Sequence, residues 1–397
     1  MTRSSFFRRA ASAAVAAALG PWAAGLAAAA DWPTYHGGYA LDGVAAGRAS
    51  AALAARWTFR ADGPVRETPV AAHGRLHFYA ASGRIYTLDL TGRQLWSRRL
   101  EDGQGPVRPS APLLVAGERL IVGTEKGALV ALDAASGATL WEYGGLESLL
   151  GSPTAAPERG LVYAVAQSDG ALHAVNLEDG TPVWKTAPTG RCDGSPATDA
   201  ARVAFGNCNA ALYVFDAATG APRGAVPLGP DGQVAGGVAL RGGRAFVGTR
   251  GGTVFCVELS DLRVVWTNAQ SRGEVFSTPA VNDRWAVYGA SDGRMYGVDA
   301  ASGRALWSRE TDDTPASPAL VGDTVAAAAG GKLHLLAAAD GRARQALTIS
   351  DEITAPAVVG GLLVVGGGDG WVRAFEWRTV GSGAPAEAGE ADRPPLR

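Results

Sequence analysis

Several kinds of chemistry have no residues to support them in this chain of 397 residues. Cysteine occurs only three times, the five histidines show no metal-ligand spacing, and no nucleophile elbow, phosphate loop or HExxH motif is present. We therefore predict no metal site and no catalytic residue, and nothing supports an ordinary hydrolase or NTPase. The formal net charge of −2 leaves no basic stripe, which excludes nucleic acid as the expected partner.

Glycine, in contrast, is abundant. The chain has 54 glycines, and 47% of its residues are hydrophobic. This composition is typical of turn-dense β-structure around a large core.

One pattern recurs eight times and is clearest from Ser291 to Trp307, SDGRMYGVDAASGRALW. Its turn position holds Gly83, Gly127, Gly170, Ala210, Gly252, Gly293, Gly331 and Gly370. An acidic or amide residue follows six positions later in seven of the eight copies, and a proline marks the start of each unit except at Gly237. These starts lie 38 to 43 residues apart. A period near forty made of short β-type runs predicts propeller blades of four strands.

A tryptophan opens the last strand of most copies. We expect its ring to cover the seam to a neighbouring blade, which makes it a structural residue. These positions are Trp57, Trp96, Trp141, Trp184, Trp266 and Trp307, whereas Gly224 and Gln345 interrupt the series.

The two ends of the repeat region complete each other. Trp57 has no preceding turn, and the segment from Pro356 to Trp377 has no tryptophan strand. We therefore predict an all-β, eight-bladed β-propeller over residues 55–378, in which the N-terminal strand closes the last blade and removes an open sheet edge.

The first thirty residues have the features of a secretory signal peptide. Arg3, Arg8 and Arg9 precede an alanine-rich apolar stretch that ends in a small-residue cleavage site at Ala30. Sec and twin-arginine export both remain open, and an uncleaved membrane anchor is the alternative. No cysteine stands near the site, so we predict a soluble periplasmic or secreted protein that is not a lipoprotein. Residues 31–54 form an N-terminal extension, and the polar tail 379–397 is predicted to be disordered.

The Asp-x-x-[ST]-Gly-x-x-x-Trp repeats and the leading Trp32-Pro-Thr-Tyr resemble the PQQ-binding-like β-propeller family. In size and blade number the chain is similar to the propeller subunit of the outer-membrane β-barrel assembly machinery. That resemblance implies a non-catalytic scaffold that binds protein or peptide partners and needs no cofactor. The chain also resembles quinoprotein dehydrogenases, which would imply PQQ with calcium over the central funnel. Blades this short leave no room for the long loops of such enzymes, so the dehydrogenase is the alternative.

Cys192 and Cys208 flank a hairpin whose turn we place at Asp199 to Arg202. This register would put the two cysteines side by side, so we predict a disulfide, with unpaired thiols as the alternative. Cys256 falls in a column of small residues and is predicted to be buried and inert.

Two of the histidines, His173 and His334, share a strand column with tyrosine and phenylalanine, so we expect them to pack in the blades. The sequence suggests no partner for His36, His73 or His77.

Charged residues precede the prolines, where the loop into each innermost strand opens at the mouth of the central channel. Mixed charges at a funnel can recognise a polar ligand or a peptide, and a solvated rim is the alternative. The candidates are Arg66, Glu67, Arg108, Asp193, Glu274, Asp351 and Glu352. We expect a monomer that binds a protein or peptide partner in the cell envelope, without an integral membrane segment after signal cleavage.

Overall fold

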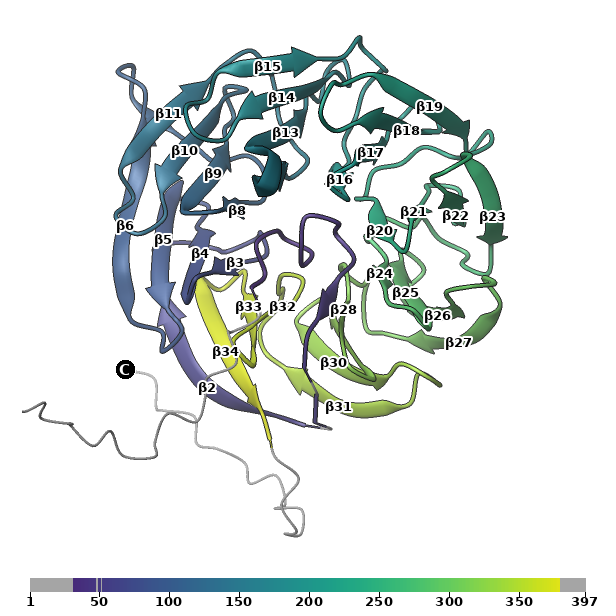
Figure 1. The fold of residues 1–397 in the computed structure, drawn as a ribbon. Helices are drawn as coiled ribbons and strands as arrows, with labels where there is room; N and C mark the ends of the chain where they lie inside the picture. Colours follow the sequence, from purple (N-terminus) through teal and green to yellow (C-terminus); the bar gives the residue numbers. More distant parts are fainter. Residues whose placement is uncertain (1–30, 48, 51, 379–397) are drawn as a thin grey trace, which may run out of the picture.

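The computed structural model describes residues 31–47, 49–50 and 52–378, and the predicted signal peptide and tail lie outside these residues. Eight β-sheets stand in a ring around a central axis (Figure 1). The prediction of an eight-bladed, nearly all-β propeller is confirmed. Within the described residues the only helical element is a single 3-10 turn, η1 (Pro157–Arg159).

Each blade runs from an inner strand at the axis to an outer strand at the rim. Blade 1 holds β3 (Val70–Ala72), β4 (Arg75–Tyr79), β5 (Arg84–Asp89), β6 (Gln94–Glu101) and the added β7 (Pro106–Val107). Blade 2 holds β8 (Leu114–Ala116), β9 (Arg119–Gly123), β10 (Leu129–Asp133) and β11 (Thr139–Tyr143). Blade 3 holds β12 (Thr154–Ala156), β13 (Leu161–Val165), β14 (Leu172–Asn176) and β15 (Pro182–Lys185). Blade 4 holds β16 (Ala197–Thr198), β17 (Arg202–Gly206), β18 (Ala211–Asp216) and β19 (Pro222–Pro227).

The second half of the ring follows the same order. Blade 5 holds β20 (Ala239–Arg241), β21 (Arg244–Gly248), β22 (Val254–Glu258) and β23 (Arg263–Asn268). Blade 6 holds β24 (Ala280–Val281), β25 (Trp285–Ala290), β26 (Arg294–Asp299) and β27 (Ala305–Glu310). Blade 7 holds β28 (Ala319–Val321), β29 (Thr324–Ala329), β30 (Lys332–Ala337) and β31 (Ala343–Thr348), with β1 (Val44–Ala45) added at its inner edge. Blade 8 joins β32 (Ala357–Val359), β33 (Leu362–Gly366) and β34 (Trp371–Trp377) to β2 (Leu53–Arg60).

The strand β2 closes the ring as predicted. It pairs antiparallel with β34, with Trp57 opposite Ala374 and Leu53 opposite Trp377. The strand begins at Leu53 rather than at the expected residue 55, because its pairing continues to the end of β34.

The acidic column forms the turn between the third and outer strands of a blade. In blade 2, Asp133 Oδ1 accepts hydrogen bonds from the Ser136 backbone N–H and hydroxyl, each at 2.7 Å. The same oxygen geometry recurs at Asp299 with Ser302. Short polar side chains that bond to the backbone two or three residues on favour such turns, which explains the repeated Asp-x-x-[ST]-Gly.

Each of the six tryptophans lies over the turn of the next blade around the ring. The Trp141 indole N–H donates to the Leu177 carbonyl at 2.9 Å, and its ring lies against Gly180. Gly180 has φ +74°, and a Cβ on it would stand 2.7 Å from the indole. The turn glycine is therefore needed twice, for its backbone conformation and for the space that the ring fills.

The first interruption of the tryptophan series is an exchange of large and small residues. In blade 4 the position holds Gly224, and the facing turn of blade 5 carries Leu262 where other turns carry glycine. A Cβ on Gly224 would overlap the Leu262 side chain, so the leucine fills the seam from the opposite side. Leu262 adopts φ +58°, which is uncommon for a leucine.

The second interruption follows from ring closure. Blade 8 takes its outer strand from the N-terminus and so has no turn for a tryptophan to cover. Gln345 stands at this seam instead, and its Oε1 accepts the Leu53 backbone N–H at 2.7 Å. Its amide nitrogen donates to the Leu53 carbonyl at 3.4 Å. A side-chain amide thus binds the main chain of the closing strand.

The residues predicted to form an N-terminal extension pack against the inner strands of the blades. Residues 32–45, which we call the N-terminal segment, lie in the centre of the ring against the inner strands (Figure 1). The main-chain carbonyls of Trp32, Pro33, Tyr39, Ala40, Asp42 and Gly43 accept N–H groups from the inner strands of blades 1, 2, 4, 5, 6 and 7, respectively. The edges of these strands face the channel, so the segment satisfies donors that the blades leave open.

The missing proline at Gly237 is explained by this segment. The Tyr35 hydroxyl lies 2.6 Å from Thr278 Oγ1. A Cβ on Gly237 would stand 2.1 Å from the tyrosine oxygen and 2.6 Å from the threonine oxygen, so neither atom leaves room for it. The Gly237 N–H also donates to Thr278 Oγ1 at 3.0 Å. A proline there would remove the donor and occupy the space of the tyrosine.

Gly237→Pro restores the residue type of the other blades, yet we expect it to lower the free energy of unfolding by about 2–4 kcal/mol. The measurement is chemical denaturation followed by tryptophan fluorescence. In a chain that also carries Tyr35→Ala the loss becomes smaller, because one of its two causes has been removed. An unchanged or increased stability of the single variant contradicts this account.

Gln345→Trp also restores a repeat residue, and we expect it to destabilise the protein by about 1–3 kcal/mol because Leu53 loses both hydrogen bonds. Gln345→Ala is the matched variant, since it loses the same bonds without adding bulk. Equal stability of Gln345→Trp and the unmodified protein in denaturation curves would show that the seam accepts a tryptophan.

Candidate functional site

The loops that precede the inner strands share one face of the ring with the turns between the second and third strands. We call this the funnel face. The backbone N–H of Glu125 donates to the Arg108 carbonyl at 3.0 Å, and that of Ser291 donates to the Glu274 carbonyl at 2.9 Å. These bonds place the predicted funnel residues beside those turns.

The predicted funnel residues form local pairs rather than one cluster. Glu274 lies 3.7 Å from Arg250, and Asp193 lies 3.0 Å from Arg191 and accepts a hydrogen bond from Gln167 at 2.9 Å. Arg66, Arg108, Asp351 and Glu352 are exposed, and no ion pair joins them to another residue in the described part of the chain. Whether these residues bind a partner stays a prediction.

Glu67 differs from the other six because it is half-buried and has no hydrogen bond from the described residues. Burial raises the pKa of its carboxyl group to about 7. Burial also raises the pKa of Tyr35 and Tyr79, and the nearby Glu67 carboxylate adds to both shifts. The loop before blade 1 thus carries a carboxyl group whose pKa burial raises well above its usual range.

Two exposed apolar side chains on the funnel face were missed by sequence reasoning. Leu150 is 47% exposed and Phe276 is 38% exposed, and the Arg250 guanidinium stands over the Phe276 ring at 5.3 Å. Each lies three residues before the proline of its blade, Pro153 or Pro279, which is a signal that the sequence does contain.

The inner loops of blades 3 to 6 pack main chain against main chain. A Cβ on Gly151 would overlap the Gly194 carbonyl, one on Gly194 would overlap the Gly236 carbonyl, and one on Gly236 would stand 2.5 Å from the Phe276 carbonyl. Glycine at three successive loops therefore draws these blades close together near the axis. This packing holds the loop of Phe276 in place.

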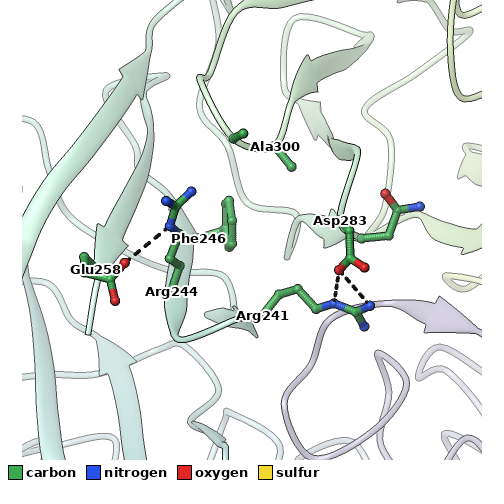
Figure 2. A pocket seen from close by; sticks show the side chains of 9 residues that line it. Arg241, Arg244, Phe246, Glu258, Asp283 and Ala300 are labelled. Carbon is green, nitrogen blue, oxygen red and sulfur yellow. Dashed lines mark hydrogen bonds and ion pairs between the residues drawn. The ribbon is translucent and has the colours of Figure 1, made fainter. Parts of the chain in front are cut away.

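A cavity of about 220 Å³ opens on the opposite face, between blades 5 and 6 (Figure 2). Arg241 and Arg244 line it together with Phe246, Glu258 and Asp283. Arg241 binds Asp283 at 3.0 Å and Asp42 at 3.1 Å, and Arg244 Nε lies 3.4 Å from Glu258. Because carboxylates balance both guanidinium groups, the cavity offers no net positive charge to an anion.

The predicted disulfide is wrong, since Cys192 and Cys208 are both free thiols. The hairpin itself has the predicted register, with Ala197 opposite Ala204. The paired residues of this hairpin are Ala197 with Ala204 and Thr198 with Val203, and the two thiols contact different groups. Cys192 Sγ lies 3.3 Å from the Gly206 carbonyl oxygen, whereas Cys208 Sγ lies 3.7 Å from Asp193 Oδ2. Burial raises the pKa of the Cys192 thiol to about 12, which keeps it unreactive.

Cys256 is fully buried in the core between blades 5 and 6, in agreement with its predicted packing role. Burial raises the pKa of this thiol to about 12 as well.

The structure supplies partners for all five histidines. His173 Nδ1 lies 2.7 Å from the Tyr143 hydroxyl, and His334 lies 3.4 Å from Asp312. The sequence suggested no partner for the remaining three. His36 contacts the Pro279 carbonyl, His73 lies near Glu118, and His77 contacts the Thr87 hydroxyl. These contacts tie the rings into the blades and do not bring them together.

The described residues do not fit calcium with a quinone. Among them no three His, Cys, Asp or Glu side chains come close enough together to hold a metal ion. Glu67 and Glu352 belong to the loops of blades 1 and 8, and only Glu67 is enclosed.

Comparison with known proteins settles the family. The family model described as outer membrane protein assembly factor BamB matches residues 22–145, 144–222 and 209–385. The chain belongs to this family. The BamB of Shewanella oneidensis is 26% identical over 268 residues, which are 61% of this chain and 66% of that protein. The BamB of Xanthomonas campestris is 26% identical over 322 residues, covering 66% of this chain and 78% of that protein. The chain thus spans slightly less than two thirds of the Shewanella relative.

Solved structures share the fold of this BamB-family chain. BamB from Moraxella catarrhalis superposes with a TM-score of 0.69 at 19% identity, over 82% of this chain and 98% of that one. The quinohemoprotein alcohol dehydrogenase from Comamonas testosteroni gives a TM-score of 0.71 at 16% identity, over 91% of this chain and 83% of that one. Similarity at these identities establishes the propeller and leaves function to the site.

Glu67→Gln tests the buried carboxyl group. The folded protein holds this proton more tightly than the unfolded chain, where the pKa is near 4.5, so stability falls as pH rises from about 4.5 to about 7. Glutamine resembles the protonated form of Glu67. We therefore compare the Tm difference, variant minus unmodified protein, at two pH values, and we expect this difference to be larger at pH 8 than at pH 5 by about 2 °C or more. The exposed Glu310→Gln is the control, and an equal Tm difference at both pH values would refute the assignment.

Proposed function

We propose that this chain is a non-catalytic scaffold that binds protein or peptide partners during outer-membrane assembly in the cell envelope. The family supports this proposal, since its members are described as outer membrane protein assembly factors. The observation that carries it is the funnel face, where Leu150 and Phe276 stand exposed among charged groups. Apolar anchors inside a polar rim are typical of protein interfaces.

The partner would meet three kinds of group on this face. Phe276 with its stacked Arg250 provides a rigid aromatic anchor, and Leu150 provides a second apolar contact from blade 3. The funnel residues Arg66, Arg108, Asp351 and Glu352 are exposed and would form the rim. Exposed charges of both signs affect orientation and association rate more than affinity, so the apolar pair should dominate binding.

The proposed setting is the periplasm or the exterior. The signal peptide would be removed after Ala30, and the mature protein would act there as a soluble monomer. No helix within the described residues is long and apolar enough to cross a membrane. The signal-peptide features of the sequence and the outer-membrane family support this placement, and the mature N-terminus can be determined by mass spectrometry.

Photo-crosslinking in living cells tests the function. A photoreactive residue at Phe276 or Leu150 should give adducts with other outer-membrane assembly proteins, identified by mass spectrometry. The matched control is Leu140, which is 48% exposed on the outer strand of blade 2. In a protein that carries the photoreactive residue at Leu150, we further expect Phe276→Ala to reduce the yield of adducts by tenfold or more. The Tm of this variant should stay within a few degrees of that of the unmodified protein. Equal labelling from Leu140 would refute the funnel face as the interface.

The alternative function is a PQQ- and calcium-dependent dehydrogenase, which the shared fold of the Comamonas testosteroni enzyme keeps under test. Purified protein is incubated with PQQ and Ca²⁺, and quinone absorbance, Tm and dye-linked alcohol oxidation are measured. Stoichiometric binding with turnover, lost in Glu67→Gln or Glu352→Gln, would overturn the scaffold proposal.

A further inference from the structure

The N-terminal segment, residues 32–45, contacts the propeller as a bound peptide would. Six of its carbonyl groups accept hydrogen bonds from backbone N–H groups of the inner strands. The donors are Ala71, Val115, Thr198, Leu240, Val281 and Leu320. These donors belong to blades 1, 2, 4, 5, 6 and 7, and the segment reaches them in the order of the blades. In blade 3 the Thr154 hydroxyl donates to the Tyr39 carbonyl at 3.0 Å. Addition of a strand to an exposed edge is a common mode of peptide recognition.

The side chains of the segment fill sites built by distant blades. Trp32 is 1% exposed and packs in a cluster with Ala319 and Val321 of blade 7 and Ala357 and Val358 of blade 8. The Tyr35 hydroxyl bonds to Thr278 of the loop before blade 6, and Leu41 packs in the core between blades 4 and 5. Main-chain bonds thus supply general affinity, and pockets for alternate side chains supply specificity.

Two glycines make room for the segment. Gly43 has φ +65°, and a Cβ on it would stand 2.5 Å from the His36 ring. Gly237, on the propeller, leaves space for the Tyr35 hydroxyl. His36 is fully enclosed, and its Nε2 lies 3.3 Å from the Pro279 carbonyl oxygen. Gly237 thus makes room in the ring for Tyr35, whereas Gly43 lets the segment fold closely over its own His36 and lie beside Ala280 of blade 6.

We propose that the inner edges of the blades form a peptide-binding ring, which the chain fills with its own residues 32–45 and which binds that segment in trans once the covalent link is cut. The ligand class is an extended peptide with the pattern Trp-Pro-x-Tyr-His and a glycine seven residues after the histidine. The tether at residues 46–52 supplies a high effective concentration and is not needed for recognition. The proposal does not rest on the partner-binding function of the funnel face.

The test uses the folded full-length protein with a specific protease site inserted between Gly47 and Ser50. After cleavage, we expect the N-terminal fragment to remain with the propeller in native gel filtration. A fluorescent synthetic peptide of residues 31–47 should then exchange into the ring in a saturable manner, measured by fluorescence anisotropy.

Matched peptides make the test specific. Gly43→Ala in the peptide should weaken binding tenfold or more, because the new methyl group meets His36 and the backbone is strained. Gly38→Ala should bind as the unmodified peptide does, since a Cβ at Gly38 meets nothing within 4 Å. Loss of the fragment on cleavage without rebinding, or equal binding of both variants, overturns the proposal.

If the ring unfolds after cleavage, addition of the peptide still tests the proposal. Recovery of the native fluorescence and Tm on addition of the peptide supports the proposal, whereas failure to recover with excess peptide overturns it. In the uncleaved protein, Gly43→Ala should speed hydrogen exchange of β8, β20 and β28 relative to Gly38→Ala. Unchanged exchange in these inner strands would refute the role of the segment as their hydrogen-bond partner.

Discussion

The contact between a tryptophan of one blade and a turn glycine of the next is the interaction on which the ring depends. Blades diverge from the axis, so a wedge opens between neighbours toward the rim, and an indole is the largest apolar side chain that can fill it. Its N–H bonds to a carbonyl of the turn that it covers, as Trp307 does with Ala338 at 2.8 Å. A polar group that would otherwise be buried without a partner is thereby satisfied, and each blade specifies the position of its neighbour.

The N-terminal part of the chain closes the ring at two places, at the rim and near the axis. At the rim, β2 pairs with β34 and completes blade 8, and at the axis the N-terminal segment satisfies the inner edges of six blades. The pairing of β2 with β34 joins residues more than 300 positions apart. The contacts of the N-terminal segment span from 39 positions, between Trp32 and Ala71, to 277 positions, between Gly43 and Leu320. Contacts between residues far apart in the chain have a loop-closure cost before they contribute energy. They are worthwhile because an incomplete ring would expose strand edges at both places.

The loops of the funnel face carry charged residues of both signs. Ion pairs there are local and mostly solvent-exposed, so they contribute little to stability and leave the rim free to adapt to a partner. The cavity between blades 5 and 6 is different, because Asp42 of the N-terminal segment and Asp283 together neutralise Arg241. The exposed apolar side chains Leu150 and Phe276 lie on the funnel face instead.

The repeat, the blade number and the closing strand could be predicted from the sequence because they follow from short-range patterns that recur every forty residues or so. Turn glycines, acidic turn residues and alternating apolar strands each act within a few positions, so eight copies reinforce one interpretation. The disulfide prediction was wrong because it needed more than a local pattern. The hairpin register was correct, but the position of the Cys192 side chain depends on the loop before β16 and on the packing of two blades.

The exceptions to the repeat were decided only by tertiary structure. Gly237 lacks its proline because Tyr35 bonds to Thr278 across 243 residues, and Gln345 replaces a tryptophan because it binds Leu53 across 292 residues. No local pattern records such a contact. The sequence by itself determined the blades, and the three-dimensional meeting of the N-terminus with the finished ring determined where the blades had to differ, because a side chain must fit the group that it touches wherever that group lies in the chain.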